Sequence, residues 1–467
     1  MHATSLAFKE NAHAALDNPV LQSALGRIKT GWVANRARAA ERLPEFEALR
    51  DQGRELKNHT LAQLDLYLLA FEAKVTALGG TVHWARDAAE ARAVVLEICR
   101  TARARTVTKS KSMVTEEIGL NAFLESNGIE PVETDLGEYI LQISGQPPSH
   151  IVGPAVHLTK DEISDLFEQH HGGRRLEDTG ALVAEARRIL RQRYLAADVG
   201  ITGANFLVAE TGGAITVTNE GNAELTQGLP RTHIVVTGLE KVVPTMEDAF
   251  TLLRLLARSA TGQEFAGYTT VMTGPRRPGD LDGPERYHVV LVDNGRTQML
   301  GNELREMLRC IRCGACMNHC PVYLATGGHA YGWVYPGPMG SVLTPQMIGI
   351  EQGWPLPNAS TFCGRCQEVC PVRIPLPKLM RYWREQQFER GLAPPAARWG
   401  LGVWGWFARR PRLYRLAPRL PVSGLRPLRR QGRIRRAPLA AGWTDTRDLP
   451  APQRGTFMRQ WRAKGHR

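Results

Sequence analysis

The stretch "CIRCGACMNHCP" (residues 310–321) decides how the second half of this chain folds. Its four cysteines follow the spacing C-x2-C-x2-C-x3-C and are followed by proline, the run by which cysteine thiolates hold iron–sulfur clusters. In two-cluster proteins of this kind, the first three cysteines bind one cluster and the fourth binds the other. The spacing therefore predicts two clusters rather than one self-contained metal site.

A second motif, "STFCGRCQEVCP" (360–371), repeats the first motif with only three cysteines. Aligned on the prolines, it matches from the second cysteine onward, and Ser360 stands at the position of the first. The crossed rule then predicts a [4Fe-4S] cluster 1 and a [4Fe-4S] or [3Fe-4S] cluster 2. The predicted ligands are Cys310, Cys313, Cys316 and Cys370 for cluster 1, and Cys320, Cys363 and Cys366 for cluster 2.

Ser360 leaves one iron of cluster 2 without a thiolate. A serine oxygen can bind as an alkoxide, although it is a harder donor than a thiolate and ionises reluctantly. Alternatively, water or a partner's group takes the position, the iron is lost, or Ser360 only fills space. In each case cluster 2 is predicted to be the more labile and oxygen-sensitive of the two.

Structural zinc is the competing interpretation of these cysteines, because zinc also binds C-x2-C pairs. Zinc favours two separated pairs and gives no reason for three cysteines at three-residue steps, so the pattern favours iron and sulfur. The eighth cysteine, Cys99, lies in "ARAVVLEICRTA" (91–102), where the helical pattern predicts a buried apolar residue.

The composition indicates a globular protein of more than one domain. The chain has 467 residues, 43% hydrophobic and 22% charged, which predicts two or three domains. No apolar run approaches the roughly 18 residues that cross a bilayer, and the N-terminus lacks the hydrophobic segment of a signal peptide. A cytoplasmic location is expected, where cysteine clusters serve metal or redox chemistry rather than disulfides.

The basic character of the chain belongs to its C-terminal part. The net charge is +13, yet residues 398–467 alone contain 18 Lys or Arg against two Asp, so the rest is slightly acidic. This part is interpreted as a solvated extension, a membrane contact aided by Trp399, Trp404 and Trp406, or a docking arm for an acidic partner. Docking is preferred. Nucleic acid is not expected, because no recognition motif accompanies the charge.

Hydrophobic patterning predicts four regions. These are an N-terminal helical segment (1–60), an α/β domain (61–295), a two-cluster iron–sulfur domain (296–395) and a basic Arg/Pro-rich extension (396–467). In the α/β domain, strands are predicted at 214–218, 233–238, 268–274 and 287–295, with a helix at 247–262, which implies a mostly parallel, covered sheet. Asn302 is predicted to cap a helix that carries the start of the first motif, and few helices are expected beyond residue 395.

Several segments resemble the lactate utilisation protein B family. The segment "GGHAYGWVYPGPMGSVLTP" (327–345) and both cysteine motifs resemble the iron–sulfur part of that family. Its LUD domain resembles "KSKSMVTEEIGLN" (109–121), "ETDLGEYILQ" (133–142) and "ETGGAITVTNEGNAELTQGLP" (210–230), and "GWTDTRDLPAPQRGTF" (442–457) is similar to its closing segment. The resemblance covers nearly the whole chain, and the family shares the seven-cysteine pattern.

This resemblance implies a fold and a function. The LUD domain would be similar to sugar-isomerase and CoA-transferase folds, and the cysteine region to an all-α helical ferredoxin. The chain would be the electron-transfer subunit of a complex that oxidises L-lactate to pyruvate and allows growth on lactate, rather than a complete enzyme. Its partners would be a cysteine-rich protein and a smaller LUD protein. Two alternatives remain open: the LUD domain itself oxidises a small hydroxy acid, or the clusters are structural in a scaffold.

No catalytic residue is recognisable, but one ligand site is predicted in the LUD segment. Lysines and hydroxyls before a helix can hold a carboxylate or phosphate, and paired glycines let a backbone approach a ligand. The residues are Lys109, Lys111, Ser112, Gly212 and Gly213. The alternative is that the glycines serve a turn and the lysines a solvated edge. Asp135 and Glu138 orient the lysines or cap a turn, and a structural role is expected for His157, His170, His171 and His233.

Overall fold

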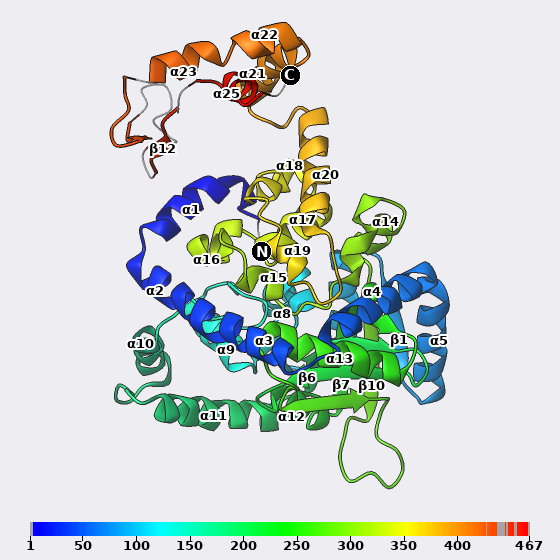
Figure 1. The fold of residues 1–467 in the computed structure, drawn as a ribbon. Helices are drawn as coiled ribbons and strands as arrows, with labels where there is room; N and C mark the ends of the chain where they lie inside the picture. Colours follow the sequence, from blue (N-terminus) through cyan, green and yellow to red (C-terminus); the bar gives the residue numbers. More distant parts are fainter. Residues whose placement is uncertain (1–2, 426, 437–443, 445–446, 453–454, 466–467) are drawn as a thin grey trace. The chain divides into compact units, whose positions relative to one another are not determined.

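Figure 1 shows the computed structural model, which describes residues 3–425, 427–436, 444, 447–452 and 455–465. The chain divides into two units, Met1–Gln386 and Gln387–Arg467. The first unit contains the α/β region and both cysteine motifs. Each unit is described by itself.

A six-stranded parallel sheet forms the centre of the first unit, with the strand order β1-β10-β7-β4-β2-β3. The strands predicted at 233–238 and 287–295 are confirmed as β7 and β10, and so is the mostly parallel character of the sheet. The six strands are β1 (Thr81–Ala85), β2 (Thr106–Lys109), β3 (Glu130–Glu133), β4 (Val199–Thr202), β7 (Thr232–Gly238) and β10 (Arg286–Val292).

Both faces of this sheet are buried. Along β10, Val290 and Val292 pack in the apolar cluster formed with α6 (Ala88–Thr101), whereas Val289 and Leu291 pack in the cluster formed with α5 (Leu64–Ala77). Alternate side chains of a strand point to opposite faces, so a strand covered on both sides reads as a continuous apolar run. Each fully buried Val or Leu contributes roughly 1.5–3 kcal/mol.

A second, mixed sheet lies beside the first in the order β8-β5-β6-β9. The predictions at 214–218 and 268–274 are confirmed as strands, but both belong to this sheet and pair antiparallel. Strands β5 and β6 are also antiparallel, because a short hairpin can join only antiparallel strands. The strands are β5 (Phe206–Val208), β6 (Gly213–Thr218), β8 (Val242–Val243) and β9 (Tyr268–Met272).

Helices surround both sheets, and the helix predicted at 247–262 is confirmed as α13. Its N-terminus has a capping box, in which the Thr245 hydroxyl accepts from the Asp248 N–H and the Asp248 carboxylate accepts from the Thr245 N–H. The helices of this region are α6 (Ala88–Thr101), α7 (Met113–Glu117), α8 (Leu120–Ser126), α9 (Leu136–Ser144), α10 (Lys160–His171), α11 (Thr179–Ala196), α12 (Asn222–Gly228), α13 (Met246–Ala260) and the 3-10 helix η3 (Leu239–Lys241).

The N-terminal helices contact both the α/β region and the cysteine region. Helix α4 packs on α13 so closely that a Cβ at Gly53 would lie 2.8 Å from Leu255 Cδ1. At the other end, the Ser5 hydroxyl donates to the Tyr331 carbonyl. The elements are η1 (Ser5–Ala7), α1 (Phe8–Leu16), α2 (Pro19–Ile28), the π-helix η2 (Lys29–Val33), α3 (Ala34–Glu41), α4 (Phe46–Ala62) and α5 (Leu64–Ala77).

Every element between 296 and 389 is helical. The helix predicted from Asn302 is corrected to a 3-10 helix that ends at Arg309, before the first cysteine, because the backbone is extended at Cys310 and left-handed at Arg312. The elements are α14 (Arg296–Leu300), η4 (Glu303–Arg309), α15 (Ala315–Asn318), α16 (Tyr323–Thr326), η5 (His329–Tyr331), α17 (Gly337–Ile348), α18 (Ile350–Gly353), η6 (Leu356–Asn358), α19 (Arg365–Glu368) and α20 (Leu376–Glu389).

The second unit corrects the expectation of few helices after residue 395. Pro395 and Pro411 begin α21 and α22, where a missing N–H costs nothing. Trp399 and Trp404 of α21 are exposed. Part of 442–457 lies outside the described residues. The elements are α21 (Pro395–Ala408), α22 (Pro411–Leu416), α23 (Arg419–Leu425), β11 (Arg433–Ile434), β12 (Leu449–Pro450) and α25 (Phe457–Ala463).

Among the helices of the described residues, none is both long enough and apolar enough to cross a bilayer.

A buried ion-pair network joins the parallel sheet to the cysteine region. Arg296, 1% exposed, bonds Glu117 at 2.8 Å and Glu240 at 2.7 Å, and the Tyr335 hydroxyl donates to Glu117. Burial raises the pKa of Glu117, but the charge of Arg296 and the hydrogen bonds from Arg296, Asn294 and Tyr335 together lower it further, so the net pKa lies below the ordinary value. The network therefore holds its carboxylates ionised in the interior.

We expect Arg296→Met to lower the free energy of unfolding of the first unit by about 3–5 kcal/mol, because it removes the only arginine paired with buried Glu117 in the described chain and one of the two paired with buried Glu240. Arg231→Met is the matched control. Arg231 pairs with Glu285 at the surface, where an ion pair contributes about 0–1 kcal/mol. Urea unfolding followed by circular dichroism measures both, and equal costs would contradict a structural role for the buried network.

Candidate metal centre and adjoining pocket

The two cysteine motifs share one backbone conformation. In the first, Arg312 (φ 59°) and Gly314 (φ 75°) are left-handed on either side of the second cysteine. In the second, Phe362 (φ 54°) and Gly364 (φ 82°) flank the corresponding cysteine in the same way. A four-residue helix, α15 or α19, follows each. Left-handed backbone is uncommon outside glycine, so its repetition at Arg312 and Phe362 indicates one constraint on both loops.

Ser360 occupies the position in the second loop that Cys310 occupies in the first. The Arg312 N–H donates to Cys310 Sγ at 3.4 Å, and the Phe362 N–H donates to Ser360 Oγ at 3.1 Å. Arg384 of α20 supports this loop, because its guanidinium lies 4.1 Å from the Phe362 ring centroid and donates to the Ser360 carbonyl. The side chain of Ser360 therefore points as a ligand at this position would.

Four thiols line one small cavity whose other walls are largely apolar; they are Cys310, Cys313, Cys316 and Cys370. Burial, and then the nearby Cys370 thiol, raise the pKa of Cys313 to about 12. Cys370 accepts a hydrogen bond at 3.3 Å from the Ile374 N–H. The second motif thus contributes one cysteine to the cavity of the first.

The other three thiols form a second group. Burial, followed by the charge of Cys320, raises the pKa of Cys366 to about 12, and Cys363 has a smaller effect in the same direction. Burial also raises the pKa of Cys320, with Cys363 contributing. Cys363 itself is exposed, whereas Cys320 and Cys366 are buried.

The donors in both groups fit an iron–sulfur cluster. Buried thiols that raise one another's pKa keep their protons tightly, and metal ions shared among them favour the thiolates instead. No three His, Cys, Asp or Glu side chains in the described ranges converge on a single metal-ion position. In a four-iron cluster each cysteine binds a different iron, so the sulfurs surround the cluster rather than converge.

Six basic side chains with little exposure surround the first thiol group: Arg36, Arg50, Lys57, Lys241, Arg309 and Arg312. They act on Cys313, Cys370 or Cys310 through their charges. A buried cation is costly unless an anion matches it. The thiolates of a bound cluster would supply that negative charge. In the second group, burial, other thiols and backbone N–H groups have the largest effects on the pKa of Cys366. No basic side chain is among these main influences.

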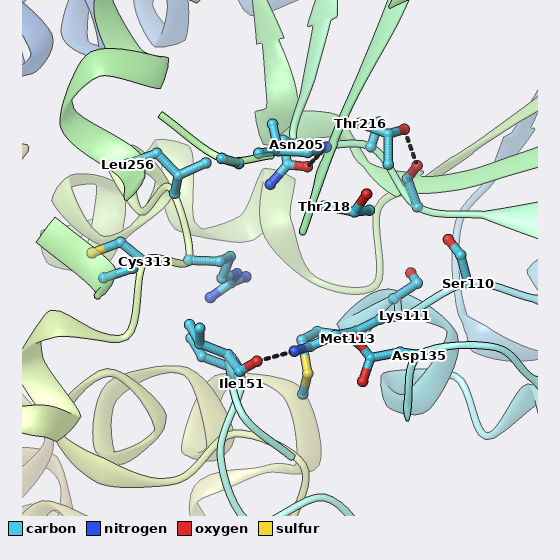
Figure 2. Close-up of a pocket in the computed structure, with 18 of the residues that line it drawn as sticks. Ser110, Lys111, Met113, Asp135, Ile151, Asn205, Thr216, Thr218, Leu256 and Cys313 are labelled. Carbon is cyan, nitrogen blue, oxygen red and sulfur yellow. Dashed lines mark hydrogen bonds between the residues drawn. The ribbon is translucent and has the colours of Figure 1, made fainter. Parts of the chain in front are cut away.

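A pocket of about 280 Å³ adjoins the first thiol group. Figure 2 shows Cys313 and Leu256 at one side of this pocket, and Ser110, Lys111 and Asp135 at the other. Residues after the ends of β2 and β4 form part of its wall, as does Thr237 near the end of β7. The pocket thus lies between the parallel sheet and the cysteine region.

Two of the predicted ligand residues, Lys111 and Ser112, line this pocket. Lys111 Nζ donates to the Val152 carbonyl. The Ser112 hydroxyl caps α7 by accepting from the Thr115 N–H. Asp135 also lines the pocket and caps α9.

Lys109 does not line the pocket. Its ammonium is fully buried at the end of β2 and pairs with Glu133 at 2.6 Å and Glu116 at 3.0 Å. It is therefore neither a solvated edge residue nor exposed to a ligand.

Glu138 lies beside Lys109 and Glu133 with both carboxylate oxygens unpartnered in the described structure. Burial, and then the charge of Glu133, raise the pKa of Glu138 well above its ordinary value.

The paired glycines lie in the β5–β6 turn, outside the pocket. Gly212 is left-handed (φ 71°), and a Cβ there would lie 3.0 Å from Lys74 Cβ on α5. A Cβ on Gly213 would lie 2.8 Å from Val271 of β9. In this structure both glycines serve a tight turn and close packing.

The histidines have neighbours typical of structural residues. His157 bonds the Ser149 hydroxyl and the Gln146 side-chain oxygen, and His233 bonds the Thr202 hydroxyl. His171 bonds the Tyr139 hydroxyl. Cys99 is completely buried in the apolar cluster beneath α6, which confirms the prediction for it.

Sequence reasoning missed the pocket residues Lys241, Thr237, Asn205 and Arg312. Thr237 had a usable signal, because polar residues at the carboxyl ends of parallel strands gather at one edge of the sheet. Arg312 had none beyond its place inside the motif. Lys241 had none either, because its burial depends on α4 and the cysteine region.

Two family matches define the class of protein. Residues 68–292 match the LUD domain, and residues 306–374 match the 4Fe-4S dicluster domain. The chain thus combines a LUD domain with an iron–sulfur domain for two clusters.

Proteins named Lactate utilization protein B are similar to this chain along almost its whole length. The protein from Geobacillus sp. (strain WCH70) is 45% identical over 457 residues, covering 97% of this chain and 96% of that one. The protein from Anoxybacillus flavithermus is 45% identical, with 97% of each chain covered, and that from Bacillus subtilis is 42% identical, with 97% and 95% covered. The chain belongs to the lactate utilisation protein B family, which confirms the resemblance seen in the motifs.

Among solved structures, a DUF162 family protein from Deinococcus radiodurans aligns with 49% of this chain and 98% of its own. The identity is 15% and the TM-score 0.28, which is too low to place any residue.

Glu138→Gln is expected to stabilise the fold near neutral pH. The raised pKa means that folded Glu138 holds its proton at pH values where the unfolded chain has lost it, so stability falls as pH rises above about 4.3. The gain should vanish at pH values below that, where both states are protonated. Urea midpoints across this range test the prediction, with Glu125→Gln at an exposed position as control. A gain independent of pH would contradict it.

Proposed function

We propose that this chain is the iron–sulfur electron-transfer subunit of a complex that oxidises L-lactate to pyruvate and supports growth on lactate. The observation that carries the proposal is the arrangement of seven cysteines as two groups, each of which takes cysteines from both motifs. The relatives named Lactate utilization protein B supply the substrate.

The proposed ligands follow the two thiol groups. Cys310, Cys313, Cys316 and Cys370 hold cluster 1, a [4Fe-4S] cluster. Cys320, Cys363 and Cys366 hold cluster 2, a [4Fe-4S] or [3Fe-4S] cluster, with Ser360 at the fourth position. The helical elements around both groups support the proposal that this region folds as a helical ferredoxin.

The chemistry supplied by such clusters is one-electron transfer, and oxidation of lactate to pyruvate releases two electrons and two protons. The protein's share is to set the charge around each group. Lys57, Lys241 and Arg36 make no ion pair with a carboxylate in the described part of the chain, and their charges act on the first thiol group, although the charge of Glu240 also acts on both lysines. These three cations favour the reduced, more negatively charged state of a cluster at the first thiol group. We therefore infer a higher reduction potential at the first group than at the second.

The proposed partners are a cysteine-rich protein and a smaller LUD protein, as the family resemblance implies. Two surface features support contacts of this kind. Cys363 is exposed, which gives a partner access to the second group. In the second unit, helix α21 exposes Trp399, Trp404 and Trp406 beside several arginines, which suits an acidic partner or a membrane surface.

A second candidate function is favoured by the pocket, because it reaches Cys313. In that case the LUD domain binds the organic acid itself. Anaerobic purification of the chain with and without its partners separates the two functions. Cluster reduction by L-lactate only in the presence of partners supports the electron-transfer subunit. Reduction of the isolated chain by L-lactate supports the second candidate, and clusters that stay redox-silent would leave a scaffold.

Cys370→Ser tests the crossed arrangement. We expect it to alter the EPR signal of the cluster at Cys310, Cys313 and Cys316, because Cys370 lines their cavity. In a redox titration of the unaltered chain, the same signal should appear at the higher potential. Cys99→Ser is the control, since Cys99 lies in the LUD core. If Cys370→Ser instead removes the EPR signal that Cys363→Ser alters, Cys370 belongs to the second group and its assignment to cluster 1 is wrong.

Ser360 variants test the fourth position of the second group. Ser360→Cys keeps the loop and adds the thiol that the first motif has, so it should give eight irons per chain in two four-iron clusters, more stable to air. Ser360→Ala removes the oxygen. If Ser360 binds iron, Ser360→Ala shifts the second cluster towards a three-iron EPR signal. Identical iron content and spectra for Ser360→Ala and the unaltered chain would show that Ser360 is not a ligand.

A further inference from the structure

The pocket beside Cys313 lies where open parallel sheets bind ligands. The chain adds β3 on one side of β2 and then β4, β7 and β10 in turn on the other side, so the strand order reverses between β2 and β4. Ligands bind outside the carboxyl ends of strands at such a reversal. Ser110, Lys111 and Ser112 follow β2, and Gly203 and Asn205 follow β4, and all five line the pocket.

Three buried polar side chains in this pocket lack partners. Lys241, only 6% exposed, makes no hydrogen bond or ion pair with any residue the structure describes. The Thr237 hydroxyl, in a residue 1% exposed, is unpartnered within the described chain, and so are both amide atoms of Asn222, which is 4% exposed. Buried polar groups are nearly always hydrogen-bonded, so these residues indicate a ligand.

The charges in the pocket select an anion with a single negative charge. The nearest carboxylate to Lys241 in sequence, Glu240, is already bonded to Arg296 at 2.7 Å and to Arg312 at 3.3 Å. Lys241 makes no ion pair with Glu240, although the charge of Glu240 acts on it, so its ammonium is available to an anion in the pocket. At the other side, Lys111 lies near Glu220 and Asp135. A carboxylate matches this balance better than a doubly charged phosphate, which would face those two acids.

The remaining walls suit a short aliphatic acid that has a second oxygen. Leu256, Ala257 and Val236 provide apolar surface. The Thr237 hydroxyl and the Asn222 amide can each donate and accept a hydrogen bond, as a hydroxyl or carbonyl oxygen next to a carboxylate requires.

We propose that this pocket binds a small 2-hydroxy- or 2-oxocarboxylate, with its carboxylate on Lys241 and its second oxygen on Thr237 or Asn222, beside the thiol group that includes Cys313. The choice of acid rests on the proposed function in lactate oxidation. Binding itself does not, because it is measured without electron transfer.

The test is equilibrium binding of radiolabelled L-lactate and pyruvate to the anaerobically purified, cluster-loaded full chain. Acetate and inorganic phosphate serve as competitors. We expect lactate or pyruvate to bind, acetate to compete at least tenfold more weakly, and phosphate not to compete. Tighter binding of lactate assigns the pocket to the substrate, and tighter binding of pyruvate assigns it to the product. Absence of binding at 10 mM, on the order of the weakest useful affinity, or equal competition by phosphate, overturns the proposal.

Two variants identify the residues. Lys241→Met should weaken binding at least tenfold and leave thermal stability equal or higher, because it removes a buried charge without a partner in the described chain. Thr237→Val keeps the shape and removes the unpartnered hydroxyl, so it should weaken binding of the 2-substituted acids but not of acetate. Lys74→Met, at an exposed position on α5, is the control and should bind as the unaltered chain does.

Unchanged affinity in Lys241→Met overturns the proposal. If Lys241→Met does not fold, Thr237→Val and Asn222→Leu decide together, because unchanged affinity in both leaves the second oxygen without its proposed partner. If binding depends on Lys241 while the clusters stay redox-silent, the binding site stands and the proposed electron-transfer function is wrong. If the clusters accept electrons but the chain binds neither acid, the proposed function stands and the binding site is wrong.

Discussion

One buried carboxylate, Glu240, holds the two halves of the first unit together. It follows β7, and it bonds Arg296 at the start of α14 and Arg312 inside the first cysteine loop. Burial opposes its ionisation, but the charges of these arginines lower its pKa to about 2. The loop around Cys313 is thereby tied to the end of a central strand. The position of the pocket, between strand ends and thiols, follows from that connection.

The two thiol groups share a backbone but differ in surroundings. The first lies among buried basic side chains and apolar walls, whereas the second has one exposed cysteine and a serine where the first has a thiol. Because charge and solvent exposure set the potential of an iron–sulfur cluster, two loops of the same conformation need not be equivalent in redox chemistry. The asymmetry comes from residues outside the motifs, chiefly from the N-terminal helices and the segment after β7.

Sequence patterns predicted those features of the structure that depend only on residues close together in the chain. Strands β7 and β10 read as apolar runs because both of their faces are buried, and cysteine spacing reveals metal sites because the loop geometry is short-range. Lys109 could not be interpreted in this way: its partner Glu133 lies on the neighbouring strand, and only the register of β2 and β3 brings the two together. Proline content does not predict the helices after residue 395, because Pro395 and Pro411 stand in first turns, where proline is tolerated.

The repeated loop also has a consequence for how this chain changes over generations. Residues 310–312 and 360–362 have matching left-handed turns and matching hydrogen bonds to their first side chain, sulfur in one and oxygen in the other. Four of the six serine codons differ from a cysteine codon by a single base. From any of these, one point mutation interconverts seven and eight motif cysteines at Ser360 without rebuilding the loop, so the number of cluster thiols is an easily altered trait on a fixed scaffold of turns.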